Sequence, residues 1–156
     1  MDIRNDVTPE ELWTCALMMS TTDPWVTMGR AVELCHAGIA HEDARILLAC
    51  ENGQVLGFLA YNMRVGIIRG YIQNLCVFEG ARGKGVGTFL MSEAEKRILE
   101  ECPNVFICVS SFNKRAKSLY ERLGYQVVGE FEDMVIRGHS EFLLRKTTGP
   151  LSEFRP

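Results

Sequence analysis

The chain has 156 residues, enough for one domain with a full core and too few for two ordinary ones. Its hydrophobic content of 47% and charged content of 24% are ordinary for a globular protein, and no apolar run reaches the roughly 20 residues that span a bilayer. The formal net charge of −3 argues against nucleic acid as a partner, because phosphate binding normally requires a basic excess.

The first third of the chain is predicted to be helical. A capping box spans Thr8 to Glu11, and apolar residues then recur at helical spacing over residues 12–19. A second helix is predicted to begin with Asp23 as its N-cap and Pro24 at its first position, and to end at Gly38.

The hydrophobic period changes to that of β-strands from residue 44. The apolar runs 44–50 and 54–63 flank Asn52-Gly53, and this dipeptide between two such runs is the strongest short hairpin signal. A third strand is predicted over residues 67–78. We therefore expect three neighbouring antiparallel strands.

The second half alternates helices and strands. After a glycine-rich loop, the patterns predict helices over 86–102 and 114–124, a buried strand over 105–111, and closing strands over 125–136 and 139–146. The order is α-α-β-β-β-α-β-α-β-β, and its strand–helix–strand crossover normally yields a parallel pair. This predicts an α/β (α+β) fold with a mixed sheet and helices on both faces.

The chain is expected to be a single domain over residues 1–146, with a C-terminal tail over 147–156 that is extended or loosely ordered. The N-terminus MDIRNDVTPEE has neither the cationic segment nor the apolar run of a secretory signal, so we expect a cytoplasmic protein. The six cysteines form no C-x-x-C pair, and we interpret them as free core thiols without a metal or disulfide role.

The stretch ARGKGVGTFL, residues 81–90, places three alternating glycines before a helix. Glycine lets backbone N–H groups converge, and a helix start leaves four of them unpaired, so the loop is a candidate phosphate site. Arg82 and Lys84 add positive charge; the alternative is a surface turn with solvated cations. The P-loop spacing fails here, and so does the dinucleotide fingerprint, because Thr88 or Leu90 takes the place of its third glycine.

A third pattern fits this loop. Residues 82–87 resemble the [QR]-x-x-G-x-[GA] signature of the GNAT superfamily, the acetyl-CoA-dependent N-acetyltransferases. Residues 113–125 resemble a second segment of that family, N-x-x-A-x-x-[LF]-Y-x-[KR]-x-G-[FY], in the expected order and on the expected element. A DPW stretch at 23–25 and RKTTGP near the C-terminus resemble an uncharacterised bacterial subgroup.

The resemblance implies a GNAT-like, mostly antiparallel central sheet of about six to seven strands, with acetyl-CoA as co-substrate. In that family the loop amides hold the coenzyme pyrophosphate, and the preceding strand receives the pantetheine arm and the thioester. The implied coenzyme-binding residues are Leu75, Cys76, Val77, Arg82, Gly83, Lys84, Gly85, Val86, Gly87, Thr88, Asn113 and Tyr120.

Tyr120 is the implied catalytic residue, because the helix would aim its phenol at the coenzyme sulfur, where it can protonate the leaving thiolate. The alternative is an aromatic side chain packed beside Leu119 and Leu123. Asn113 is either a coenzyme contact or a helix N-cap, and both roles can hold together.

The acceptor side is less defined. The strand before the loop lacks the glutamate that some family members use as a base, and Asp133, His139 and Glu141 are substitutes, with hairpin or surface roles as the alternative. Trp25 either lines the acceptor site or covers the edge of the core. The candidate acceptor-site residues are Trp25, Asn74, His139 and Glu141.

The expected function is direct transfer of acetyl from acetyl-CoA to a primary amine on a protein, a peptide or a small molecule. Two alternatives are a non-catalytic acyl-CoA-binding sensor of the same fold and a nucleotide-binding switch. Edge strands in the C-terminal half allow two chains to pair as a homodimer.

Overall fold

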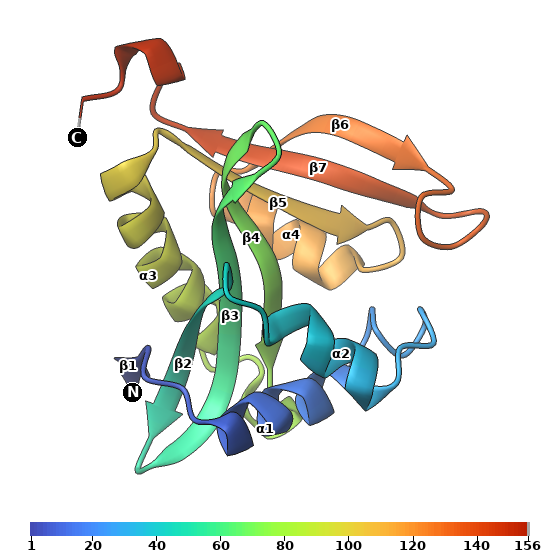
Figure 1. Cartoon of the computed structure of the whole chain (residues 1–156). Helices are drawn as coiled ribbons and strands as arrows, with labels where there is room; N and C mark the ends of the chain where they lie inside the picture. The colour runs from blue at the N-terminus through green and yellow to red at the C-terminus, as the bar shows by residue number, and fades with distance from the viewer. Residues whose placement is uncertain (156) are drawn as a thin grey trace.

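One seven-stranded sheet organises the molecule, in a computed structural model that describes residues 1–155 (Figure 1). The strand order is β1-β2-β3-β4-β5-β7-β6, and every neighbouring pair is antiparallel except β4 and β5. The strands are β1 (Asp2–Arg4), β2 (Arg45–Glu51), β3 (Gln54–Val65), β4 (Ile68–Val77), β5 (Asn104–Ser110), β6 (Gln126–Glu132) and β7 (Ser140–Thr147). This confirms the predicted mixed, mostly antiparallel sheet.

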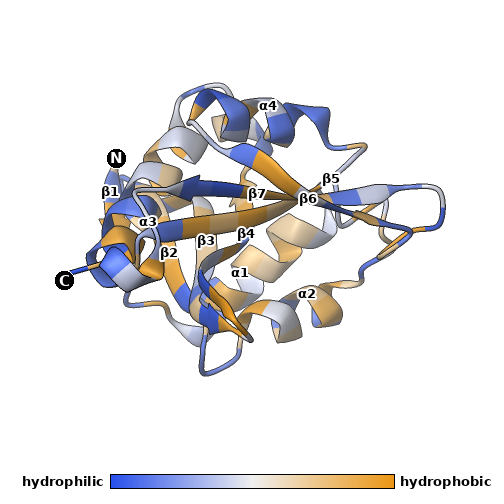
Figure 2. Cartoon of the chain, turned by 90° about the horizontal axis from the view of Figure 1, so that it is seen from above, coloured by the Kyte–Doolittle hydropathy of each residue, from blue (hydrophilic) through white to orange (hydrophobic). Residues whose placement is uncertain are grey.

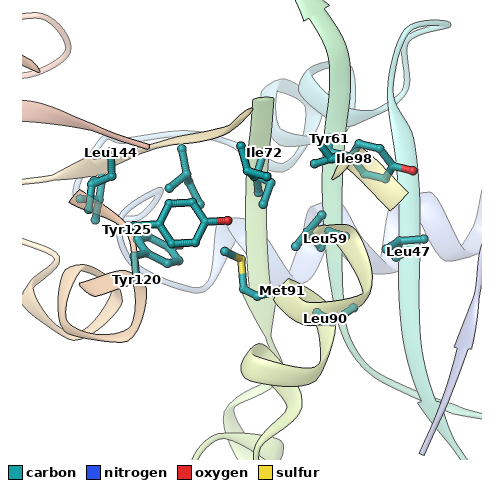
Figure 3. Close-up of a cluster of buried hydrophobic side chains, with 14 of the residues drawn as sticks. Leu47, Leu59, Tyr61, Ile72, Leu90, Met91, Ile98, Tyr120, Tyr125 and Leu144 are labelled. Carbon is teal, nitrogen blue, oxygen red and sulfur yellow. The ribbon is translucent and has the colours of Figure 1, made fainter. Parts of the chain in front are cut away.

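Helices cover both faces of the sheet, as predicted: Figure 2 shows α4 on one side and α1 and α2 on the other. The helices are α1 (Pro9–Ser20), α2 (Val32–Ile39), α3 (Val86–Glu101) and α4 (Lys114–Arg122). The strand sequences are continuous apolar runs because successive side chains point to opposite faces of the sheet, and each face packs against a hydrophobic core. In β2, Leu47 and Ala49 face the cluster that α3 covers, where Figure 3 labels Leu47, whereas Leu48 and Cys50 face the cluster that α1 and α2 cover.

The local signals at one turn and one helix start are confirmed. Thr8 caps α1, since its side chain accepts a hydrogen bond from the Glu11 amide and the Glu11 side chain accepts one from the Thr8 amide. Asn52 and Gly53 join β2 to β3 with φ values of 51° and 78°, as a two-residue hairpin turn requires. None of the helices within residues 1–155 is long and apolar enough to cross a membrane.

The predicted start of the second helix is wrong, because α2 begins at Val32 and residues 21–29 form turns. Asp23 caps a turn instead of a helix: its carboxylate accepts hydrogen bonds from the Thr27 amide (3.2 Å) and the Thr27 hydroxyl (2.6 Å). The Asp23–Pro24 peptide bond is cis. Trp25 is only 8% exposed and belongs to the core beneath α1 and α2, so tertiary packing outweighs the local helix signal.

Three further differences lie near the ends of the chain. β1 was not predicted; its three residues pair with β2, and Arg4 also forms an ion pair with Glu11 (2.8 Å). The strand predicted over 125–136 ends at Glu132, where a loop over residues 133–139 begins. The predicted tail contains a short 3-10 helix (Leu151–Glu153), and Pro156 lies outside the described residues. The domain boundary at residue 146 stays a prediction.

The parallel pair between β4 and β5 is short, and this positions the site. Only Tyr71 and Ile72 of β4 have partners on β5, namely Phe106 and Ile107. Just beyond them, the register between β4 and β3 shifts at a β-bulge that includes Gln73. β4 and β5 then diverge (Figure 1), so within the described chain residues 73–77 have no strand partner on that side.

The close approach of β5 to β4 depends on Gly70, whose φ is +72°. A Cβ there would collide with the Asn104 carbonyl oxygen and lie 2.6 Å from a methyl group of Ile98. We expect Gly70→Ala to lower the free energy of unfolding in urea by about 3 kcal/mol, from left-handed strain plus overpacking. Gly66→Ala is the matched control: its φ is +58° with no atom within 4 Å, so only the strain of about 1 kcal/mol applies. Equal losses in the two variants would contradict this account.

Candidate active site

A groove of about 1100 Å³ opens where β4 and β5 part. The end of β4, the glycine loop and the start of α3 form one wall, α4 forms another, and the connection between α1 and α2 forms the rim. The predicted coenzyme-binding residues that line it are Leu75, Cys76, Val77, Arg82, Gly83, Gly85, Val86, Gly87, Thr88, Asn113 and Tyr120. Of the predicted set, only Lys84 does not line the groove.

The glycine loop leaves a row of backbone N–H groups unpaired. Gly83 and Gly85 take φ values of 78° and 83°, and the first backbone bond of α3 runs from the Phe89 amide to the Gly85 carbonyl (2.9 Å). Within residues 1–155, the amides of residues 83–88 donate to no backbone acceptor, and no side chain caps the helix. Such converging amides at a helix N-terminus form an anion site.

The side chain of Arg82 is held inside the protein. Its Nε donates to the Val77 carbonyl (3.1 Å), and its Nη2 donates to the Thr22 hydroxyl (3.0 Å). Arg82 therefore ties the end of β4 to the connection between α1 and α2, which leaves its guanidinium only partly free for a ligand.

Other cations lie along the groove, and the sequence reasoning did not assign them. Lys114, Arg115 and Arg122 of α4 line it. In the sequence these residues resemble the solvated face of a helix. They reach the groove because the arrangement of the strands brings α4 to it. Together with the loop amides they give the groove a positive wall suited to a polyanion.

Tyr120 projects from α4 into the core cluster and borders the groove (Figure 3). It is 5% exposed, and burial raises the pKa of its phenol well above the ordinary 10.0. Its ring lies 6.2 Å from that of Tyr125. The packed-aromatic role is thus confirmed, and it is compatible with a hydroxyl that faces the groove.

Asn113 caps α4, because its Oδ1 accepts a hydrogen bond from the Ala116 amide (3.3 Å). The N-cap alternative is confirmed. Since Asn113 also lines the groove, the coenzyme contact stays a prediction.

The candidate acceptor-site residues are dispersed. Trp25 is packed in the core and does not line the groove, although its neighbours Asp23 and Val26 do. Asn74 is half-buried on β4, and its Oδ1 has no hydrogen-bond partner within residues 1–155. The DPW stretch thus borders the groove through Asp23 and not through Trp25, because residues 21–29 form turns and α2 starts late.

The two candidates near β7 differ in burial. His139 is exposed and packs edge-on against Phe112, a groove residue, with ring centroids 5.1 Å apart. Glu141 is only 8% exposed and accepts a hydrogen bond from the Ser110 hydroxyl (2.6 Å). The surface role considered for Glu141 is therefore wrong, because the β5–β7 pairing encloses it.

The Acetyltransferase (GNAT) family model matches residues 10–125, which include the glycine loop, α3 and all of α4. The chain belongs to this family.

Solved structures share the fold of this GNAT protein at low sequence identity. An aminoglycoside 6′-N-acetyltransferase complexed with coenzyme A is 18% identical, with a TM-score of 0.76 over 100% of this chain and 99% of that one. NAA60 of Arabidopsis thaliana, in complex with a bisubstrate analogue, is 17% identical, with a TM-score of 0.75 over 95% and 99% of the two chains. A GNAT-family protein from Desulfovibrio desulfuricans is 18% identical, with a TM-score of 0.78 over 95% and 99%.

Alkaline pH should destabilise this GNAT protein through its buried acids. Burial raises the pKa of Cys15 and Cys76 to about 12, from ordinary thiol values of 9.0, and raises the pKa of Tyr120 as well. Above the ordinary values the unfolded chain loses protons that the folded chain keeps, so the free energy of unfolding falls as pH rises, by up to about 1.4 kcal/mol per group and pH unit. Urea unfolding at about pH 7.5 and about pH 10.5 measures this. Equal stabilities would contradict it.

Proposed function

We propose that this GNAT protein transfers an acetyl group directly from acetyl-CoA to a primary amine. The observation that carries the proposal is the row of unpaired amides over residues 83–88, which opens into the groove that Tyr120 borders. The reaction is expected in the cytoplasm, since all six cysteines are free thiols.

The coenzyme fits the groove by its chemistry. Its diphosphate is an anion for the amides of residues 83–88, and Lys114, Arg115 and Arg122 supply further positive charge for its phosphates. Its pantetheine arm carries amides that can pair with the free edge of β4 over residues 73–77, as an added strand would. This arrangement directs the thioester toward the split between β4 and β5.

The chemistry needs an attacking amine and a proton for the leaving group. The amine nitrogen forms a bond to the thioester carbonyl carbon, and the carbon–sulfur bond breaks as the tetrahedral intermediate collapses. Tyr120 donates its proton to the departing thiolate, and the proton that the amine nitrogen loses restores the phenol. Burial raises the pKa of the groove-lining Cys76 thiol to about 12 and also raises the pKa of Tyr120, so the pKa of a coenzyme thiol buried in the same groove would shift in the same direction as that of the phenol that protonates it.

The acceptor class is supported by the relatives. One solved structure of the same fold is named as an aminoglycoside 6′-N-acetyltransferase, so an amine on a sugar is a reasonable first choice of acceptor. Asp23, at the rim of the groove, adds negative charge that suits a cationic acceptor.

A thiol-reagent assay with acetyl-CoA and a panel of amines tests the proposal. The panel contains an aminoglycoside, a peptide with a free N-terminus, a lysine-containing peptide with a blocked N-terminus, and a polyamine. We expect amine-dependent release of free CoA with at least one of them. Protein that is stabilised by CoA but releases none with any amine would instead be the acyl-CoA-binding sensor.

A further inference from the structure

Glu141 is a buried carboxylate without a cation. It is 8% exposed, and its Oε1 accepts a hydrogen bond from the hydroxyl of Ser110, which is 2% exposed. Within residues 1–155, no Lys, Arg or His nitrogen forms an ion pair with it. A buried carboxylate is costly unless a cation or a proton accompanies it, so a positively charged guest would be favoured at this place.

The position of Glu141 links it to the groove. It pairs with Ser110 at the end of β5, past Ile107, the last residue of β5 that pairs with β4. Its neighbour Phe142 packs on the α3 and α4 side, so the Glu141 side chain faces the side of α1 and α2. The carboxylate therefore lies on the α1 and α2 side of the sheet, one strand away from the opening between β4 and β5, because β5 stands between β7 and β4.

Tyr71 on β4 lies near both the Glu141 carboxylate and Tyr120, the proposed acid. Burial is the main cause that raises the pKa of Tyr71, and the nearby Cys108, Glu141 and Tyr120 raise it further. Tyr71 is thus within electrostatic reach of both Glu141 and Tyr120, which come from β7 and α4. The two groups flank the same split strand pair.

The other two candidate bases are occupied or exposed. Asp133 holds its own loop, since its carboxylate accepts a hydrogen bond from the Gly138 amide, and it is exposed. His139 is exposed and packs on Phe112. Among these three, only Glu141 is enclosed by the sheet.

We propose that Glu141 binds the ammonium form of the acceptor amine beside the split and accepts the proton that the nitrogen must lose before it attacks the thioester. The freed lone pair then attacks the carbonyl carbon, the carbon–sulfur bond breaks, and Tyr120 protonates the sulfur. The second proton lost by nitrogen restores the phenol, and Glu141 releases its proton to solvent. Ser110 is a positioning residue, because its hydroxyl orients the carboxylate. This inference rests on the proposed acetyl transfer.

The pH profile of Glu141→Gln is the test. Glutamine has nearly the same shape and can still accept the Ser110 hydrogen bond, so calorimetry should show unchanged CoA affinity. With the reactive amine of the panel, we expect kcat/KM at neutral pH to fall at least about tenfold. The remaining activity should rise about tenfold per pH unit up to the pKa of the amine itself, because only free amine can then react. The kcat/KM of the wild-type protein should reach its plateau at a lower pH than that of the variant.

Glu132→Gln on the neighbouring strand is the matched control, since Glu132 is exposed and its loss should change neither value. Tyr71 and Cys108 lie near Glu141, Tyr120 lies near Tyr71, and His139 packs on the groove residue Phe112. His139→Gln should leave the fall of wild-type kcat/KM at acidic pH (its acid limb) in place. Movement of that limb in His139→Gln would assign it to the imidazole and overturn the inference.

A second variant covers the case in which Glu141→Gln does not fold. Ser110→Ala removes the donor that favours the charged carboxylate, so the acid limb of kcat/KM should move to higher pH. Unchanged profiles in both variants, with wild-type turnover intact, would overturn this inference alone. Wild-type protein that binds CoA and acetylates no amine would overturn the proposed function, and this inference with it.

Discussion

Tyr120→Phe should lower kcat by about 100-fold and leave the affinity for CoA nearly unchanged. The change removes one oxygen from a side chain that already packs in the core cluster, so the ring contacts persist. What is lost is the proton donor for the coenzyme thiolate. Steady-state kinetics together with calorimetric titration of CoA separates this loss from a binding defect.

Tyr125→Phe is the control for that experiment. The two rings lie 6.2 Å apart in the same cluster (Figure 3), but Tyr125 does not line the groove. Burial and the nearby Glu95 carboxylate raise the pKa of Tyr125, so its hydroxyl has a different neighbour from the groove that Tyr120 borders. This control should retain wild-type kcat. Full turnover in Tyr120→Phe would remove Tyr120 from the mechanism.

Gly87→Leu should lower the affinity for CoA at least tenfold, a loss of about 1.4 kcal/mol or more. A Cβ at Gly87 would point between Leu119 (3.5 Å), Val77 (3.7 Å) and Leu75 (3.9 Å), all of which line the groove. An added isobutyl group would therefore fill the space that the coenzyme needs. Calorimetry measures the loss, and circular dichroism checks the fold.

Gly87→Ala is the matched variant. Its single methyl group would make only ordinary van der Waals contacts with Leu119, Val77 and Leu75. It should keep CoA affinity and gain slightly in stability, because alanine is the better helix former. If leucine and alanine at this position bind CoA equally well, the coenzyme does not pass beside Gly87.

The sequence predicted features that short stretches determine by themselves. The Thr8 capping box, the Asn52-Gly53 hairpin and the glycine loop are local, since backbone geometry and a few hydrogen bonds decide them. The order of strands and helices then followed from the period of the hydrophobic residues. The assignment of the loop and Tyr120 to one site came from the resemblance of residues 82–87 and 113–125 to the GNAT signatures.

Features that depend on packing between distant segments were missed. Trp25 buries its ring beneath α1 and α2 and overrides the helix start that Asp23 and Pro24 suggest. The guanidinium of Arg82 finds its partners in Val77 and Thr22, the second of them 60 residues away. Neither contact produces a periodic pattern or a motif in the sequence.

The acceptor side shows the same limit. Glu141 follows a loop and resembles a surface residue in the sequence, and only the pairing of β7 with β5 encloses it. Lys114 and Arg115 resemble a solvated helix face until the split between β4 and β5 brings α4 to the groove. Tertiary position, and not residue type, separates these from ordinary surface charges.

Isothermal titration of the folded protein with CoA, and separately with pantetheine, tests the central claim most directly. If the amides of residues 83–88 hold the diphosphate, CoA should bind at a single site at least about tenfold more tightly than pantetheine, which lacks that group. No detectable binding of CoA, or equal affinity for the two ligands, would contradict the account.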